Sequence, residues 1–280
     1  MLDFLVELFS YGFIVRALLV GTFVSLCSAL LGVSLVLKRY SMIGDGLSHV
    51  GFGALAVAAV LGWAPLAVAI PVVMLAAFLL LRLSDASRIK GDAAIGLLSA
   101  SALAAGVMLI SVTKGMNTDL LNYMFGSILA MQSSDVWLST LLSVAVLLLY
   151  VIFYNRLFAV TFDENFARAG GIDTGFYKAL LAFLTALTVV LGMRMMGALL
   201  ISSLIIFPAL TAMRLCRTYR SVIICASVLA VLCFWSGLIL SYLYETPTGA
   251  TVVLINLLFF CLFSLLSLLR RRKRSHSLSE

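Results

Sequence analysis

The chain has 280 residues, of which 63% are hydrophobic and only 11% are charged, and its formal net charge is +7. This composition excludes an ordinary water-soluble domain, in which roughly 45–50% of residues are apolar and about 25% are charged. We therefore expect a polytopic membrane protein made of helices, because a helix satisfies its backbone hydrogen bonds without water.

Apolar segments follow one another along the chain, each close to the about 20 residues that a helix needs to cross the hydrocarbon core. They comprise 14–37, 44–62, 65–82, 92–112, 135–155, 177–193, 196–213, 221–243 and 249–269. The sequence thus predicts an all-α transmembrane bundle with eight or nine spans, eight if the Gly- and Ala-rich pair 44–62 and 65–82 is bent or partly re-entrant. The N-terminal stretch is acidic and lacks signal-peptide features, so we expect the first span to be retained.

The positive charge is concentrated after the last apolar segment, in Arg270, Arg271, Arg272, Lys273 and Arg274. Such a cluster marks the cytoplasmic end of a helix or contacts anionic lipid more often than it binds nucleic acid. With this end inside, alternation places the basic loops 38–42, 82–90, 155–174 and 214–220 inside and the N-terminus outside. We predict a transmembrane domain over 1–269 and a basic cytoplasmic tail over 270–280.

The longest of these inside loops contains a helix-forming pattern. It consists of two acidic residues, two neighbouring apolar residues and two glycines: Asp163, Glu164, Phe166, Ala167, Gly170 and Gly171. The acids are expected to cap and stabilise the start of a helix, and the glycines are expected to end it. We predict a short docking helix at about 163–171 with Phe166 and Ala167 on its apolar face. The alternative is an amphipathic linker that lies on the membrane surface.

Asp45 and His49 stand out in the second apolar segment, because ionisable side chains are costly inside a membrane and tend to mark a substrate path. Their spacing of four residues puts both side chains on one face of a helix. An imidazole with a carboxylate suits Zn²⁺, Mn²⁺ or Fe²⁺ better than Ca²⁺ or Cu⁺. In the alternative interpretation Asp45 caps a helix and His49 donates to a backbone carbonyl.

Two ligands do not complete a tetrahedral zinc site, and the chain offers no second cluster of ligand residues. Asp45 and His49 from each of two copies, related by a two-fold axis, would supply the four ligands that zinc usually takes. The five cysteines occur singly in or beside apolar segments without metal-binding spacing, so we interpret them as packing residues.

The sequence contains no G-x-x-x-x-G-K-[ST] loop, no H-E-x-x-H and no G-x-S-x-G motif. If ATP drives transport here, another chain therefore hydrolyses it. An intramembrane metallohydrolase would need at least three protein ligands and a general base, and the single histidine in the apolar segments is too few for that class of enzyme. An ion-coupled carrier would not require a docking helix. Carriers also usually show internal repeats, which this sequence does not display, so both features disfavour a carrier.

These features together resemble the bacterial ABC-transporter permeases for zinc, manganese or iron(II) uptake. The resemblance extends from "LLGVSLVLKRYSMIGDGLSHVGFGALA" through "DLLNYMFGSILAM", "TFDENFARAGGI" and "GALLISSLIIFPALTAMRL" to "YLYETPTGATVVL", and "LNYMFGSI" and "SYLYETPTGAT" are most similar to the zinc branch. It implies that Asp45 and His49 face the translocation path and that the loop 163–171 is a coupling helix.

The resemblance also implies partners: a second permease copy, usually identical, two cytoplasmic ATPases and an extracytoplasmic metal-binding protein. From it we expect an importer subunit in the bacterial inner membrane, with a cytoplasmic C-terminus, no nucleic-acid partner and no permanently bound cofactor. Zn²⁺ is the expected cargo, with manganese or iron(II) import as the alternative and an ion-coupled metal carrier as the more distant one.

Overall fold

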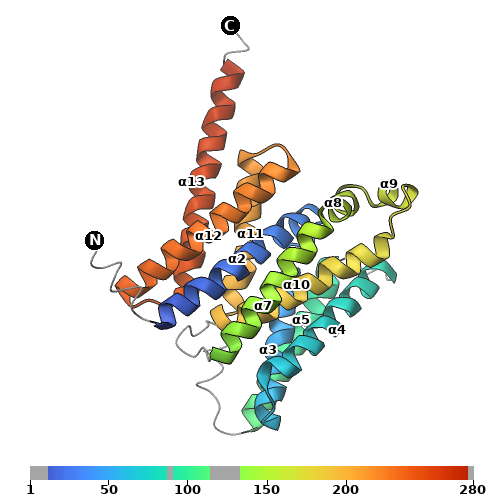
Figure 1. Cartoon of the computed structure of the whole chain (residues 1–280), viewed down its shortest axis with the longest axis vertical. Helices are drawn as coiled ribbons and strands as arrows, with labels where there is room; N and C mark the ends of the chain where they lie inside the picture. Colours follow the sequence, from blue (N-terminus) through green and yellow to red (C-terminus); the bar gives the residue numbers. More distant parts are fainter. Residues whose placement is uncertain (1–11, 87–90, 114–132, 277–280) are drawn as a thin grey trace.

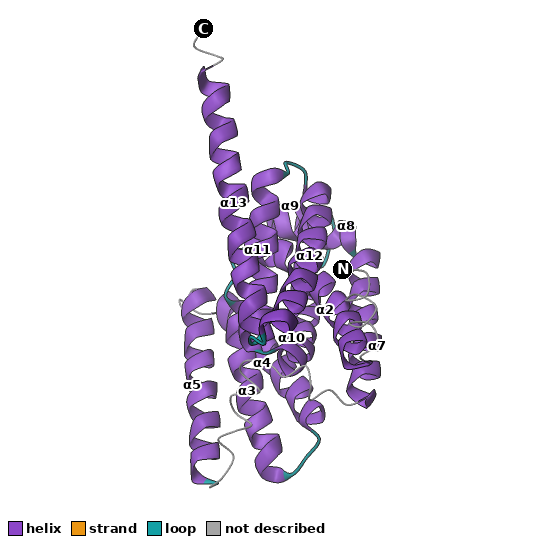
Figure 2. Ribbon diagram, turned by 90° about the vertical axis from the view of Figure 1, so that its left-hand side faces the viewer, coloured by secondary structure: helices purple, strands orange, loops and turns teal. Residues whose placement is uncertain are grey.

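The computed structural model describes residues 12–86, 91–113 and 133–276, and throughout these ranges its regular elements are helices (Figures 1 and 2). In chain order they are α2 (Gly12–Leu37), α3 (Ile43–Leu61), α4 (Pro65–Ala86), α5 (Gly91–Val112), α7 (Ser133–Ile152), α8 (Tyr154–Phe162), α9 (Glu164–Ala169), α10 (Thr174–Met196), α11 (Ala198–Leu215), α12 (Tyr219–Tyr244) and α13 (Thr248–His276). The predicted all-α class is confirmed.

Each predicted apolar segment coincides with one of these helices to within a few residues at most boundaries. Within the described ranges, 7 helices are long and apolar enough to cross a membrane, and a bent pair of helices raises the number to as many as 8. Pro65–Leu80 of α4 is a shorter apolar helix beside them. The polytopic class is therefore confirmed, and the count favours the lower of the two predicted numbers. The last helix, α13, continues past residue 269 to His276 and extends beyond the rest of the bundle (Figure 1).

The bend lies where the sequence predicted a straight span over 135–155. Instead α7 ends at Ile152, and α8 leaves it at an angle of 69°. The new direction lets α8 bury Leu157 and Val160 against the bundle. The ring of Tyr219, at the start of α12, lies 4.9 Å from the ring of Phe158 in α8. Hydropathy did not predict this bend, because it follows from contacts with a helix far away in the sequence.

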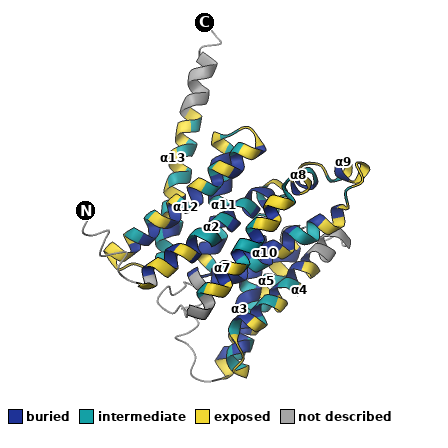
Figure 3. Ribbon diagram, in the orientation of Figure 1, coloured by how far each residue is buried: buried dark blue, intermediate teal, exposed yellow. Residues whose placement is uncertain are grey.

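Helices α2 and α10 occupy the centre of the bundle, where buried residues predominate (Figure 3). Helix α2 packs against α7, α10, α11 and α12, and α10 packs against α3, α4 and α11. Small residues allow helices to approach closely in a membrane, where burial of apolar side chains alone provides little driving force. At Gly32 of α2, a Cβ atom would lie 2.1 Å from the backbone oxygen of Ile205 in α11.

Replacement of Gly32 by alanine is therefore expected to lower the free energy of unfolding, by about 1–3 kcal/mol for overpacking. The obstacle is backbone, which cannot rotate away as a flexible side chain can. The fraction of protein that remains monodisperse after heating in detergent measures the effect. Gly96→Ala in α5 is the matched control, because a Cβ there meets nothing within 4 Å. Equal thermal stability of the two variants would contradict this account of the α2–α11 contact.

The segments beside three of the loops predicted to lie on the inside, 38–42, 155–174 and 214–220, are neighbours in the structure, and the fourth, 82–90, lies partly outside the described residues. Near the end of α2, the Ser34 hydroxyl lies 2.8 Å from the Tyr219 hydroxyl at the start of α12 and 3.2 Å from that of Tyr150 in α7. Tyr150 and Tyr219 lie 3.0 Å apart, which closes a triangle of buried hydroxyl groups. This triangle ties together the ends of α2, α7 and α12 at one end of the bundle, as the positive-inside pattern predicts.

Candidate functional site

Asp45 lies in the first turn of α3, immediately after a tight connection from α2. Two backbone hydrogen bonds shape that connection, from Tyr40 N to Leu35 O at 2.9 Å and from Ile43 N to Tyr40 O at 3.1 Å. Arg39 adopts a left-handed conformation with φ of 62° between them. A carboxylate near a helix N-terminus is favoured by the helix dipole. The short connection therefore sets the position of Asp45 relative to α2.

His49 follows one turn later, and its Nε2 atom lies 3.6 Å from Oδ2 of Asp45. The prediction that the two side chains share a helix face is thus confirmed. The alternative, in which Asp45 caps the helix, does not match the structure, because the N-cap residue is Met42 and no side chain caps the helix there. The carboxylate instead faces the imidazole.

A third polar group reaches this pair from α11. The Ser202 hydroxyl lies 3.5 Å from Oδ1 of Asp45 and also donates to its own helix, to Ala198 O at 3.2 Å. Sequence reasoning did not assign Ser202 a role, since it is one of many serines and lies 157 positions from Asp45. The only sequence signal was its place in the "GALLISSLIIFPALTAMRL" stretch that carried the resemblance.

The pair is partly exposed and lies next to tightly packed glycines. The Asp45 side chain is 44% exposed and that of His49 is 23% exposed. Gly44 and Gly46 flank Asp45 and face isoleucines of α11 and α5, which a Cβ would approach to 2.7 Å and 2.4 Å respectively. The glycines therefore bring neighbouring helices close to α3, while the carboxylate stays partly exposed.

One chain supplies too few ligands to enclose an ion. In the part of the chain that the structure describes, no group of three or more His, Cys, Asp and Glu side chains is placed to bind a metal. Asp45 and His49 offer one carboxylate and one imidazole, a donor set that suits the borderline divalent metals. Completing a four-ligand site from two copies remains a prediction.

The predicted short helix is present as α9, with Asp163 as its N-cap. The Asp163 side chain accepts a hydrogen bond of 2.9 Å from Phe166 N, and Gly171 has the positive φ of 80° that ends the turn. Phe166 and Ala167 do not form one face, however. Phe166 is 75% exposed, whereas Ala167 is 2% exposed and packs against the permease core. Consecutive helical residues point about 100° apart, so of these two side chains only Phe166 faces outward.

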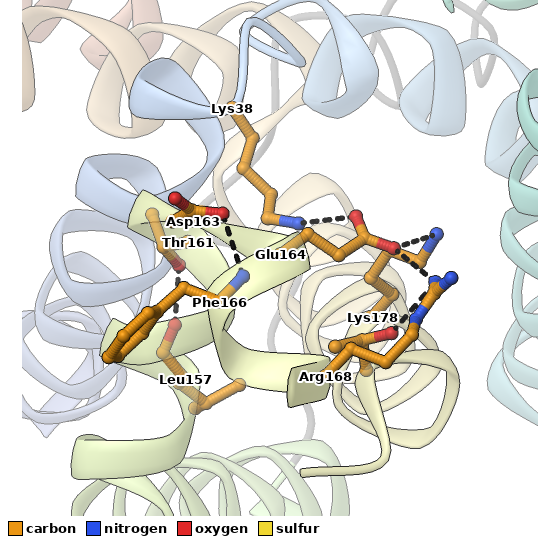
Figure 4. A network of polar contacts seen from close by, with 9 residues as sticks. Lys38, Leu157, Thr161, Asp163, Glu164, Phe166, Arg168 and Lys178 are labelled. Carbon is orange, nitrogen blue, oxygen red and sulfur yellow. Dashed lines mark hydrogen bonds and ion pairs between the residues drawn. The ribbon is translucent and has the colours of Figure 1, made fainter. Parts of the chain in front are cut away.

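Glu164, the first residue of α9, is surrounded by three cationic side chains (Figure 4). Its carboxylate lies 3.0 Å from Lys178 Nζ of α10, 3.2 Å from Arg168 of α9 and 3.8 Å from Lys38 Nζ of the α2–α3 connection. The sequence assigned Glu164 only the stabilisation of its own helix. Its two lysine partners come from other segments, Lys178 from the next helix and Lys38 from the distant α2–α3 connection, and neither was predicted.

Residues 10–267 match the model of the ABC 3 transport family. The manganese import system permease protein ScaB of Streptococcus gordonii is 33% identical over 258 residues, which cover 92% of each chain. The high-affinity zinc uptake system membrane protein ZnuB of Haemophilus influenzae is also 33% identical, over 92% of this chain and 97% of that protein. The solved structure of PsaBC from Streptococcus pneumoniae in complex with Fab superposes with a TM-score of 0.83 at 33% identity, over 93% of this chain and 94% of that chain.

Proposed function

Because this chain belongs to the ABC 3 transport family, we propose that it is the permease subunit of an ATP-driven importer of divalent metal ions. As a member of that family it is a transport subunit and not the ATPase. The observation that carries the proposal is the Asp45–His49 pair: an ionisable pair on one helix face, partly open, inside an apolar bundle. Such a pair is costly in a membrane and tends to mark the path of a transported ion.

We propose Zn²⁺ as the cargo. Two copies that face each other would bring two imidazoles and two carboxylates together, and this number and mixture of ligands suits tetrahedral zinc. Mn²⁺ is the second candidate, because a relative named for manganese import and one named for zinc uptake are equally identical to this chain. The two ions share nitrogen and oxygen ligands, so the relative affinity of the site for each must be measured.

The proposed assembly contains a second permease copy, a pair of cytoplasmic ATPases and an extracytoplasmic protein that delivers the ion. The short helix α9 supports the ATPase contact, since it presents the exposed Phe166 beside the basic α2–α3 connection, which Glu164 of α9 contacts through Lys38. The basic tail 270–280 would lie on the same, cytoplasmic side of the bacterial membrane.

The proposal predicts ATP-dependent metal uptake by the assembled transporter. The permease and its partner ATPase, reconstituted in vesicles with ATP enclosed on the ATPase side and the ion-delivering protein outside, should accumulate radioactive zinc. Excess unlabelled Zn²⁺ should suppress this uptake more strongly than excess Mn²⁺. Stronger competition by Mn²⁺ would favour the second candidate. Equal uptake by the permease without ATPase or ATP would contradict the proposal and favour the carrier alternative.

A further inference from the structure

The ion pairs around Glu164 differ in how well they are shielded from water. The Lys38 and Lys178 side chains are 10% and 13% exposed, whereas that of Arg168 is 67% exposed. Exposed ion pairs contribute little, while pairs shielded from solvent interact more strongly. The two ion pairs that connect Glu164 to residues outside α9, Lys38 and Lys178, are therefore shielded from water. The pair with Arg168, within α9, is exposed.

Lys38 connects this carboxylate to the candidate ion site by a short stretch of backbone. Its N–H donates to Ser34 O of α2 at 3.1 Å, so Lys38 extends that helix. The connection closed by the Tyr40 and Ile43 hydrogen bonds then leads into α3 and its first-turn Asp45. The second partner, Lys178, lies on α10, which packs against both α2 and α3. A displacement of Glu164 thus acts on the α2–α3 connection directly and on α3 through α10.

We propose that Glu164 is a positioning residue that transmits movement of α9 to the α2–α3 connection and thereby to the Asp45–His49 pair. The inference rests on the proposed function, in which α9 contacts the ATPase. When the ATPase moves α9, the Glu164–Lys38 pair carries the α2–α3 connection with it, so that hydrolysis and the ion site change together. Without this pair α9 loses its direct link to the α2–α3 connection, and only the indirect route through Lys178 and α10 remains.

The Lys38→Met substitution tests this role, because it removes the cation and keeps an unbranched apolar side chain. The Asp163 cap, the exposed Phe166 and the Glu164–Lys178 pair remain, so ATPase docking persists. In vesicles containing permease and ATPase, stimulated ATP hydrolysis should continue, while zinc transported per ATP should fall by at least about fivefold, the low end of typical coupling between sites. A residue that only stabilises α9 would lower hydrolysis and transport in proportion.

Three further variants sharpen the test. Lys38→Arg keeps the charge and should restore most of the transport per ATP. Arg39→Gln, the matched control, removes the neighbouring exposed charge from the same connection and should leave that ratio unchanged. Glu164→Gln should lower the ratio, and adding Lys38→Met should lower it little further, since both changes remove one shared contact.

The outcomes separate this inference from the proposed function. If the wild-type complex shows no ATP-dependent uptake, the proposed function fails. If the wild type transports zinc and Lys38→Met transports as much per ATP, the inference is wrong. A proportional loss of hydrolysis and transport would overturn it as well. If Lys38→Met does not assemble with the ATPase, the Glu164→Gln variant is the deciding test. A wild-type ratio of zinc transported per ATP hydrolysed in Glu164→Gln would exclude the positioning role of Glu164.

Discussion

Replacement of His49 by alanine is expected to abolish ATP-driven metal uptake while the permease still folds and binds its ATPase. The change removes the imidazole that faces Asp45 at 3.6 Å, and it does so in both copies of a homodimer. The remaining carboxylates cannot provide the nitrogen ligands that zinc prefers. Uptake of radioactive zinc into vesicles measures the loss, and co-purification of the ATPase shows that assembly persists.

The His49→Asn variant separates an ion ligand from a structural histidine. Asparagine keeps a neutral hydrogen-bond donor of similar reach, so it would largely rescue a residue that merely bonds to a neighbouring acceptor. We expect no rescue, since an amide is a poor zinc ligand. Substantial zinc uptake by the His49→Asn variant would contradict the assignment of His49 as a ligand of the transported ion.

Two further expected results concern the Asp45–His49 pair. Ser202→Ala removes a hydroxyl at the long distance of 3.5 Å from Asp45, so uptake should fall much less than in His49→Ala. With zinc bound, Asp45 and His49 of both copies should lie roughly 2.0–2.2 Å from the ion. Side chains too far apart to share an ion in both inward-open and outward-open states would exclude the shared site and leave one separate site in each copy.

Replacement of Phe166 by glutamate is expected to abolish stimulation of the ATPase. Phe166 is 75% exposed on a helix of 6 residues, so the new charge disturbs little internal packing and would lie in the proposed contact with the ATPase. Burying an unpaired charge in an apolar contact costs several kcal/mol, which is enough to prevent docking. ATP hydrolysis by the mixed proteins and their co-elution on size exclusion report the result.

The control at the same position is Phe166→Leu, which retains an apolar contact and should keep most of the stimulation. Ala167→Asp offers a contrast, because Ala167 is 2% exposed and a charge there disturbs the packing of α9 on the permease itself. That variant should lose thermal stability as well as coupling. Wild-type stimulation by Phe166→Glu would exclude α9 as the docking helix.

The sequence by itself determined the features that depend on neighbouring residues. Apolar length specified where the helices form, because a span must satisfy its backbone internally. The spacing of Asp45 and His49 determined their shared face, since residues four apart in a helix lie one turn apart. The Asp163 cap and the Gly171 turn were likewise predictable, because each is a hydrogen bond or a backbone conformation within one short segment.

The tertiary structure alone decided the features that depend on how helices pack. It bends α8 away from α7 through contacts with α2 and α12, and it turns Ala167 into the buried core. It brings Ser202 to Asp45 and Lys38 to Glu164, which are separated by 157 and 126 positions respectively (164 − 38). Periodicity cannot specify such pairs, because the relative placement of two helices follows from close packing of small residues along their whole contact, as at Gly32 and Ile205.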